Sequence, residues 1–382
     1  MLLRELSDED KTFRRKTRKW LEENLPREKA RTHFGLHHDR DWQRIVAKGG
    51  YLGPHWRRED GGMGLSPLQE VIMIEEWARA GAPMIASQEM NHIGPIILRL
   101  GTEEQKREHL PKMFRAERSW AQGYSEPGAG SDLSSLRTVG VIDGDMMVIN
   151  GQKIWNTMAH RADWMFVLIR TAEGRRGLTL ILVDLASPGI KRNSIRDMTG
   201  DTELAEVFFD DVRVPLSNVV GEINDGWRVA TAVLKAERLR AGCPERALSA
   251  LFRLREAVAA TGADSDPWLR ERLARAEVAV LTLEAAYLDA LEREHANPEN
   301  DELDGSCMKV QEAVTTQYVL KVLQDVVGPN KALLTPHGIP SGYVDFSKAY
   351  MASLANSIMG GTDEIQRTLI AQGALDLPRP VK

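Results

Sequence analysis

The stretch Ser125-Glu126-Pro127-Gly128-Ala129-Gly130-Ser131-Asp132 separates a helical pattern of residues from a pattern of short strands. Its proline, glycines and small side chains allow the backbone to approach a flat ligand closely. Taken alone, such a run is more often an ordinary glycine-rich turn. It is not a dinucleotide-binding fingerprint, because no βαβ pattern surrounds it. The neighbouring sequence must therefore decide between a turn and a binding loop.

The composition is that of a folded globular protein. The chain has 382 residues, which exceeds the size of one hydrophobic core, so we expect two or three packed units. Apolar residues make up 42% and charged residues 27%, and the net charge of -5 argues against nucleic acid as a partner. No apolar stretch approaches the roughly 20 residues that span a bilayer. We expect a soluble, cytoplasmic protein without a membrane span.

Two possible sites for disulfides or metals are weak. Cys243 and Cys307 are too few for a disulfide framework or a zinc cluster and fit a reducing compartment. His33 and His37 are four residues apart, but no acidic or cysteine ligand with suitable spacing accompanies them. We therefore expect no metal site.

The N-terminal part reads as helical, because apolar residues recur at helical spacing from Ser7 to Arg118. One predicted helix runs from Pro67 to Arg79, with Ser66 as its N-cap. Another runs from Thr102 to Phe114 and is capped by Thr102 itself.

The middle part reads as strands. The dipeptides Asp143-Gly144 and Asn150-Gly151 separate short apolar runs and predict two tight hairpins. Long helical patterns return from Gly226 onward. The sequence predicts an α+β multidomain protein. Its parts are an N-terminal α-helical domain (residues 1–118), a middle antiparallel β-barrel-like domain (119–222) and a C-terminal four-helix-bundle domain (223–382).

Two further segments accompany the opening stretch. Asn150-Gly151-Gln152-Lys153-Ile154-Trp155-Asn156-Thr157 ends a predicted strand with an aromatic side chain and polar neighbours. Gly360-Gly361-Thr362-Asp363-Glu364-Ile365-Gln366-Arg367 opens the last predicted helix. The three segments and their order resemble the acyl-CoA dehydrogenase superfamily over nearly the whole chain.

The resemblance implies an FAD cofactor bound against the β domain. By match to the family's motifs, Gln122 and Ser125 contact the pyrimidine side of the flavin. Trp155 forms a wall beside the ring system, and Thr157 is the hydrogen-bond partner near N5. The redox chemistry is then that of the cofactor.

The resemblance also implies an acyl-CoA thioester held between the flavin and the C-terminal helices. Ser131 matches a residue that serves the cofactor site and faces the CoA side. Thr362 and Glu364 match positions near the FAD diphosphate and adenylate. A phosphate contact of CoA is the sharper interpretation for Arg238. The alternative is that the arginines from Arg238 to Arg275 belong to a solvated helix face.

The family reaction removes a proton from the α carbon while a hydride leaves the β carbon for flavin N5, giving a 2,3-enoyl-CoA. It needs a carboxylate base in a dry pocket and donors to the thioester carbonyl. In many members the base is a glutamate directly before the Gly-Thr of the C-terminal signature. Here that position is Gly360, which retains only a backbone N–H for the thioester oxygen.

A subset of the family, including isovaleryl-CoA and long-chain types, places the base on an earlier helix, as a glutamate before an arginine. Glu237-Arg238 matches this pattern. The residues around Glu237 also give an independent signal, because it lies on the apolar stripe of its predicted helix, formed by Val229, Ala230, Val233, Leu234 and Ala241. A carboxylate on such a stripe needs a reason. It is either the catalytic base or half of a buried structural ion pair.

Family members commonly carry an Arg-x-x-Phe-Gly stretch that reaches the FAD adenine of a neighbouring subunit, and none occurs between Ala247 and Ala276. Some bacterial members assemble from two different chains. The resemblance implies electron-transfer flavoprotein as acceptor and a homodimer or homotetramer, with a heteromeric partner chain as the alternative assembly. A flavin oxidase or monooxygenase and a non-catalytic or partly catalytic subunit are the alternative functions.

Overall fold

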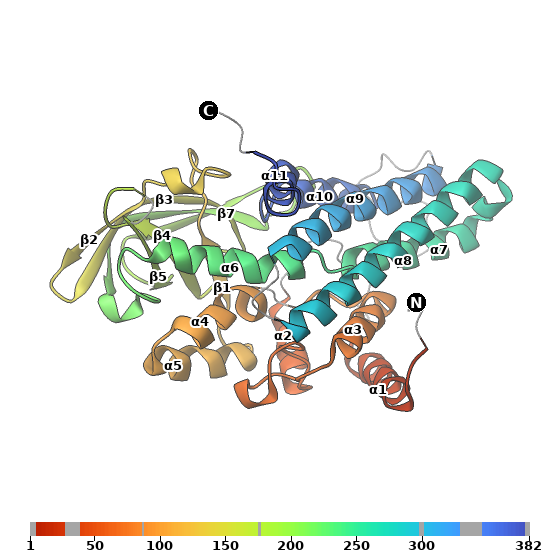
Figure 1. Ribbon diagram of the computed structural model, residues 1–382, viewed down its shortest axis with the longest axis horizontal. Coiled ribbons are helices and arrows are strands. Elements are labelled where there is room, and N and C mark those ends of the chain that lie inside the picture. The colour runs from red at the N-terminus through yellow and green to blue at the C-terminus, as the bar shows by residue number, and fades with distance from the viewer. Residues whose placement is uncertain are drawn as a thin grey trace. The chain divides into compact units, whose positions relative to one another are not determined.

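The computed structural model describes residues 5–26, 39–85, 88–174, 177–297, 302–328 and 346–378. His33 and His37 lie outside these ranges. Contacts divide the chain into two compact units. The helical unit comprises Met1–Trp42, Pro54–Met84 and Arg238–Lys382, and the sheet unit comprises Gln43–Gly53 and Ile85–Glu237. Figure 1 labels their elements.

The helical unit packs N-terminal helices with C-terminal ones. Its helices are α1 (Asp8–Asn24), α3 (Pro67–Ala80), α7 (Glu245–Thr261), α8 (Pro267–Ala296), α9 (Glu302–Val327), α10 (Phe346–Ser353) and α11 (Asp363–Gly373). The long helices α7, α8 and α9 run side by side (Figure 1) and enclose a core that includes Leu251, Leu283 and Leu323. Burying such side chains contributes about 1.5–3 kcal/mol each.

The sheet unit carries its own short helices. They are the π-helical turn η2 (Gln88–Ile93), α4 (Gly94–Leu100) and α5 (Glu103–Phe114). Two helices, α2 (Arg40–Lys48) and α6 (Gly226–Ala241), have residues in both units. The structure also contains short 3-10 turns η1 (Arg58–Asp60), η3 (Leu133–Ser135), η5 (Leu216–Asn218), η6 (Ala263–Ser265) and η8 (Leu354–Ser357).

Both predicted helix starts are confirmed. Ser66 accepts a hydrogen bond from the Gln69 amide at the start of α3, and Thr102 accepts one from the Gln105 amide at the start of α5. In each case the glutamine side chain returns a bond to the cap backbone, which completes a capping box. The Gln105 side chain also donates to the carbonyl of Val219, so it fastens α5 within the sheet unit.

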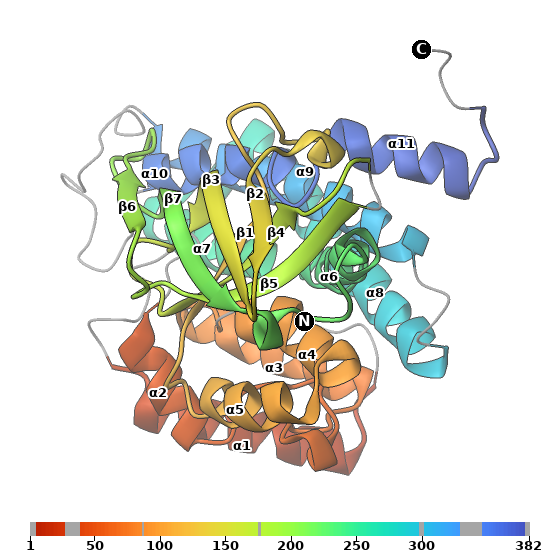
Figure 2. The same ribbon diagram turned by 90° about the vertical axis from the view of Figure 1, so that its left-hand side faces the viewer.

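One seven-stranded sheet forms the centre of the sheet unit. Its strands are β1 (Trp120–Gly123), β2 (Val139–Asp143), β3 (Met146–Thr157), β4 (Trp164–Arg170), β5 (Leu178–Asp184), β6 (Ile190–Ile195) and β7 (Leu204–Pro215). Their order is β1-β4-β2-β3-β7-β6, with β5 paired to β4. The sheet is curled (Figure 2), and most pairings are antiparallel. The parallel pairings of β4 with β1 and β2 are not predicted by the sequence.

The predicted hairpin at Asn150-Gly151 is wrong, because β3 continues through both residues. The strand shifts register against β7 between Ile149 and Gly151, as a bulge does. The Asn150 side chain exchanges two hydrogen bonds with Asp211 of β7, so it connects β3 to the neighbouring strand. Gly151 has φ 147°, and a Cβ there would lie 2.6 Å from Thr138 Oγ1. The glycine is needed for a bulge and a close approach, not for a turn.

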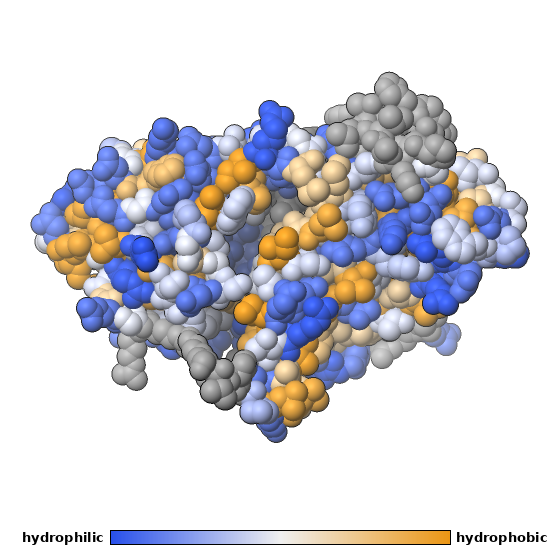
Figure 3. Space-filling view, turned by 90° about the horizontal axis from the view of Figure 1, so that it is seen from above, coloured by the Kyte–Doolittle hydropathy of each residue, from blue (hydrophilic) through white to orange (hydrophobic). Residues whose placement is uncertain are grey.

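Among the described residues, no helix is both long and apolar enough to cross a bilayer. On the face shown in Figure 3, hydrophobic residues occur in small separate groups among hydrophilic ones.

Candidate functional site

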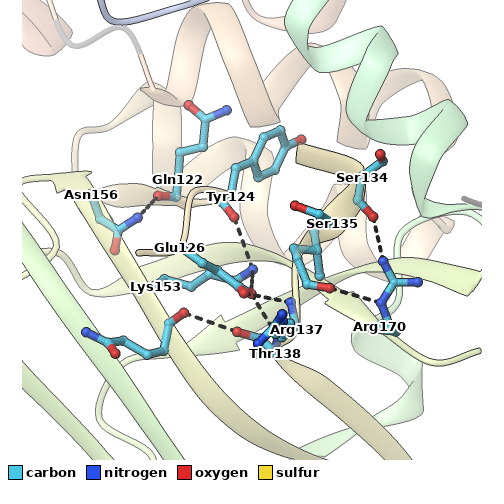
Figure 4. A network of polar contacts seen from close by, with 12 residues as sticks. Gln122, Tyr124, Glu126, Ser134, Ser135, Arg137, Thr138, Lys153, Asn156 and Arg170 are labelled. Atoms are coloured by element: carbon cyan, nitrogen blue, oxygen red, sulfur yellow. Dashed lines mark hydrogen bonds and ion pairs between the residues drawn. The ribbon is translucent and has the colours of Figure 1, made fainter. Parts of the chain in front are cut away.

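The loop after β1 is tied to the sheet by a buried ion pair. Glu126 Oε1 lies 2.8 Å from the ammonium of Lys153 on β3, and Figure 4 shows the pair among its hydrogen bonds. The amides of Arg137 and Thr138 donate to the same carboxylate, at 2.6 and 2.8 Å. The Lys153 ammonium also donates to the Tyr124 carbonyl. Glu126 therefore has a structural role within the opening stretch.

Both groups of this pair are charged at neutral pH. Burial alone would raise the pKa of Glu126, but the Lys153 charge and the donors to its carboxylate outweigh burial and lower it. Burial lowers the pKa of Lys153 to about 8, with the Glu126 charge acting in the opposite direction. A buried pair of this kind stabilises the loop only while both partners are present.

The outer side of the loop is open. Glu126 and Ala129 exchange two backbone hydrogen bonds that close the turn, and Ala129 is buried beneath it. A Cβ at Gly128 or Gly130 would meet no atom of the described part of the chain within 4 Å. The protein's own packing therefore does not require these glycines, although a ligand lying close to the backbone would. Ser131 is exposed beside them.

The end of β3 is joined to the end of β1. The side-chain amide of Asn156 donates to the backbone carbonyl of Gln122 at 2.8 Å (Figure 4). The backbone amide of Ile154 donates to the backbone carbonyl of Ser125 at 3.0 Å. Asn156 Oδ1 is buried and has no hydrogen-bond partner in the described residues. These contacts place Gln122, Ser125 and Thr157 in one region of the sheet unit.

Trp155 stands out in this region, because its side chain is 57% exposed and its φ is 64°. A bulky residue in the left-handed region is strained, and such strain gathers at ligand sites. Its neighbour Thr157 is half-buried. An open glycine loop, an exposed indole and an unsatisfied amide oxygen together fit a flat, polar-edged ring such as a flavin.

Helix α6 carries Glu237 as its last residue within the sheet unit. Val229, Ala230 and Val233 of its stripe are fully buried, as predicted. The Glu237 side chain is 14% exposed, and its Oε2 lies 3.8 Å from Nε2 of His92 and has no hydrogen-bond partner among the residues that the structure describes. Within the described residues, no arginine or lysine forms an ion pair with it. The described residues therefore contain no arginine partner that would make Glu237 half of a buried structural ion pair.

The C-terminal signature belongs to the helical unit. Gly360 and Gly361 have φ 66° and 86°, and the Gly360 carbonyl accepts a hydrogen bond from Gln366. Thr362 caps α11 by accepting from the Ile365 amide. A buried ion pair between Lys309 and Asp363, 2.9 Å long, holds the start of the helix.

Glu364 and Arg238 are the two other predicted site residues of the helical unit. Hydrogen bonds from its own amide and from Thr362 lower the pKa of Glu364, which lies at the exposed start of α11. Arg238 is half-buried where α6 passes close to Gly305 of α9. The expected solvated arginine face is wrong in part. Arg240 is paired with Glu70 and Glu294, and Arg253 is 1% exposed.

Sequence reasoning missed three residues. Lys153 was read only as part of a strand, although a lysine within a buried strand register would have indicated an inward-facing partner. Tyr124 and His92 carried no signal in the sequence, because each is surrounded by residues of mixed character. Among the described residues, no group of three or more histidine, cysteine, aspartate or glutamate side chains could hold a metal ion.

Comparison with known proteins gives a consistent family. The model described as acyl-CoA dehydrogenase, N-terminal domain, matches residues 7–117. The corresponding middle-domain and C-terminal-domain models match residues 121–212 and 224–375. Acyl-CoA dehydrogenase IpdE1 of Mycobacterium tuberculosis is 38% identical, and the alignment covers 97% of this chain and 98% of IpdE1.

Two solved structures are similar over their whole length. The one described as "Tcur3481-Tcur3483 steroid ACAD" superposes with a TM-score of 0.86 at 30% identity, covering 100% of both chains. The crystal structure of the ChsE4-ChsE5 complex from Mycobacterium tuberculosis gives a TM-score of 0.85 at 29% identity, again covering 100% of both chains.

Replacing Lys153 by methionine should destabilise the protein by about 3–5 kcal/mol, because it leaves the Glu126 carboxylate buried without its partner. Adding Glu126→Gln should recover part of this loss. Since the pKa of Glu126 is depressed, its contribution is present above about pH 4.3 and is lost as the pH falls through its lower folded-state value. Denaturant unfolding at several pH values measures both effects. Lys191→Met, at an exposed lysine of β6, is the control, and an equal loss there would contradict the prediction.

Replacing Trp155 by asparagine should weaken FAD binding about tenfold, because the indole supplies ring contact. Asparagine tolerates the left-handed conformation, so the free energy of unfolding of the apoprotein should not fall. Fluorescence titration with FAD and denaturant unfolding give the two quantities. Trp268→Asn changes a comparably exposed tryptophan on α8 and should leave FAD affinity unchanged. Unaltered affinity in Trp155→Asn would exclude the indole from the flavin site.

Proposed function

The chain belongs to the acyl-CoA dehydrogenase family, and on this premise we propose that it converts an acyl-CoA thioester to the 2,3-enoyl-CoA with Glu237 as the proton-abstracting base. One observation supports this choice of base above all. Glu237 lies on the apolar stripe of α6 and has a carboxylate oxygen without a hydrogen-bond partner in the described residues. A base must keep such an oxygen available for the proton it takes.

When bound, FAD would supply the acceptor for the hydride that leaves the β carbon at flavin N5. Glu237 would take the α proton, and its limited exposure would keep water from competing for that position. Gly360 would donate its N–H to the thioester oxygen, which acidifies the α C–H bond. Its carbonyl is already engaged by Gln366, so the orientation of this part of the backbone is held in place.

The remaining motif residues would bind the two ligands. We assign Gln122, Ser125, Trp155 and Thr157 to the flavin ring system, since they gather around the open loop of the sheet unit. Ser131 would serve the cofactor and the CoA side, and Arg238 a CoA phosphate. Thr362 and Glu364 would lie toward the FAD diphosphate and adenylate. The domain boundaries at residues 118 and 222 remain a prediction.

A bulky, ring-bearing acyl group is the substrate class that we propose. It is supported by the similarity to the structure described as a steroid ACAD. A panel of thioesters tests it by anaerobic bleaching of the flavin. We expect polycyclic acyl-CoA thioesters to bleach the flavin at least about tenfold faster than straight-chain ones, since a pocket shaped for rings leaves a thin chain poorly oriented. A faster rate with straight chains would overturn this assignment.

A second chain in the assembly is the alternative that an observation favours. The Arg-x-x-Phe-Gly stretch is missing between Ala247 and Ala276, and the structures described by the paired names Tcur3481-Tcur3483 and ChsE4-ChsE5 are similar over the whole chain. A partner chain would then supply the adenine end of the FAD site. If no second chain takes part, we expect the protein to assemble as a homodimer or homotetramer. We propose an electron-transfer flavoprotein as the electron acceptor.

Replacing Glu237 by glutamine should slow flavin bleaching by substrate about 10²- to 10⁴-fold while FAD content stays the same, because the amide cannot take a proton. Stopped-flow absorbance under anaerobic conditions measures the rate. Glu245→Gln is the control. Burial raises the pKa of Glu245 to about 7, so a neutral amide there changes little. A bleaching rate close to that of the unmodified protein in Glu237→Gln would rule out this base. A colourless purified chain would instead favour the non-catalytic subunit.

A further inference from the structure

Glu237 lies beside a histidine that the proposed mechanism does not use. His92 belongs to the π-helical turn η2, and its Nε2 is 3.8 Å from Glu237 Oε2. Only 8% of the His92 side chain and 14% of the Glu237 side chain are exposed. The two atoms are too far apart for a hydrogen bond, yet Oε2 has no other hydrogen-bond partner in the described residues. A shift of about one ångström would bring them into hydrogen-bonding distance.

The hydrogen bond at Nδ1 determines whether Nε2 of His92 can donate or accept a hydrogen bond. Nδ1 lies 2.8 Å from the side-chain oxygen of Gln88, one turn earlier in η2. An amide oxygen only accepts hydrogen bonds, so Nδ1 carries the hydrogen and donates it. In the neutral imidazole, Nε2 then presents a lone pair to Glu237. It can accept a hydrogen bond from a protonated carboxyl group, but it has no hydrogen to give to a carboxylate.

Tyr124 is a second titratable group of the sheet unit, and its pKa is affected by the charge of Glu237. Burial, together with the negative charge of Glu237, raises the pKa of Tyr124, so the phenol keeps its hydrogen. Its hydroxyl has no hydrogen-bond partner in the described residues. The ring is held edge-to-face against Phe166 and is directed away from the Lys153–Glu126 pair (Figure 4). The Tyr124 hydroxyl therefore has a hydrogen to donate, whereas the Nε2 lone pair of neutral His92 can only accept one.

We propose that His92 is a positioning residue for Glu237, whose carboxyl group donates a hydrogen bond to His92 Nε2 once it has taken the α proton. In this step the α C–H bond breaks and an O–H bond forms on Oε2. The electron pair of the broken bond stays with the substrate and becomes the second bond of the new C=C, as the β C–H pair leaves as hydride. No proton moves on to His92. The inference rests on the proposed function, since it takes Glu237 as the base.

Two variants of His92 separate this role from a packing role. His92→Gln keeps an acceptor that can reach Glu237, whereas His92→Asn keeps a polar group near Gln88 that cannot. The flavin-loaded protein is reacted anaerobically with its best acyl-CoA thioester, with hydrogen or deuterium at the α carbon. We expect His92→Asn to slow bleaching about tenfold, the effect of one hydrogen bond, with a larger isotope effect and unchanged thioester affinity. His92→Gln should stay within about threefold of the unmodified rate.

The outcomes distinguish the two proposals. Equal slowing in both His92 variants, or no slowing in His92→Asn, would overturn the positioning role. Loss of activity in Glu237→Gln alongside an unaffected His92→Asn would overturn only this inference, whereas an active Glu237→Gln would overturn the proposed base itself. His109→Asn is the matched control. It changes a second buried histidine of the sheet unit, packed against Trp120 and Trp164, and should leave the isotope effect unchanged.

Discussion

The buried ion pair between Glu126 and Lys153 is the constraint on which the proposed ligand-binding face of the sheet unit depends. It connects the loop after β1 to the middle of β3, and the amides of Arg137 and Thr138 add two donors that bring in the start of β2. Two charges in a protein interior are tolerated only when every bond is made. The cost of breaking the pair therefore holds three segments in one arrangement. The open backbone around Gly128 and Gly130 is exposed by this same arrangement.

Polar groups beneath this loop differ from others of the sheet unit in their hydrogen bonding. Beneath it, the Glu126 carboxylate and the Lys153 ammonium have their partners within the protein. Elsewhere in the sheet unit, the Asn156 side-chain oxygen, the Tyr124 hydroxyl and Glu237 Oε2 have no hydrogen-bond partner in the described residues. Leaving a buried polar atom unsatisfied costs about 1–3 kcal/mol. Such an atom can gain a partner from a bound ligand, and the strained, exposed Trp155 directly precedes Asn156 in β3.

The sequence predicted those features that depend on neighbouring residues. The caps Ser66 and Thr102, the buried stripe of α6 and the order of helical and strand regions were correct because each follows from local spacing. Asn150-Gly151 was misread as a turn, because its role depends on Asp211, sixty-one positions later. The parallel pairing of β4 and the approach of His92 to Glu237 also join distant segments. Contacts of this kind leave no periodic signal in a single sequence, so they cannot be predicted from it.

The position of Glu237, the proposed base, determines which contacts align its side chain. In the common family pattern the carboxylate precedes the Gly-Thr of the C-terminal signature, which here belongs to the helical unit. Glu237 instead belongs to the sheet unit, the same compact body that carries Gln122, Ser125 and Trp155. The start of α6 packs directly on β5 (Figures 1 and 2), where a Cβ at Gly226 would lie 2.6 Å from the Thr179 backbone. Glu237 belongs to the same helix of sixteen residues, so this contact at the start of the helix also fixes the backbone position of Glu237. The distance between the proposed base and the residues proposed to bind the flavin is thus set by packing within one unit, and proton abstraction requires such precise positioning.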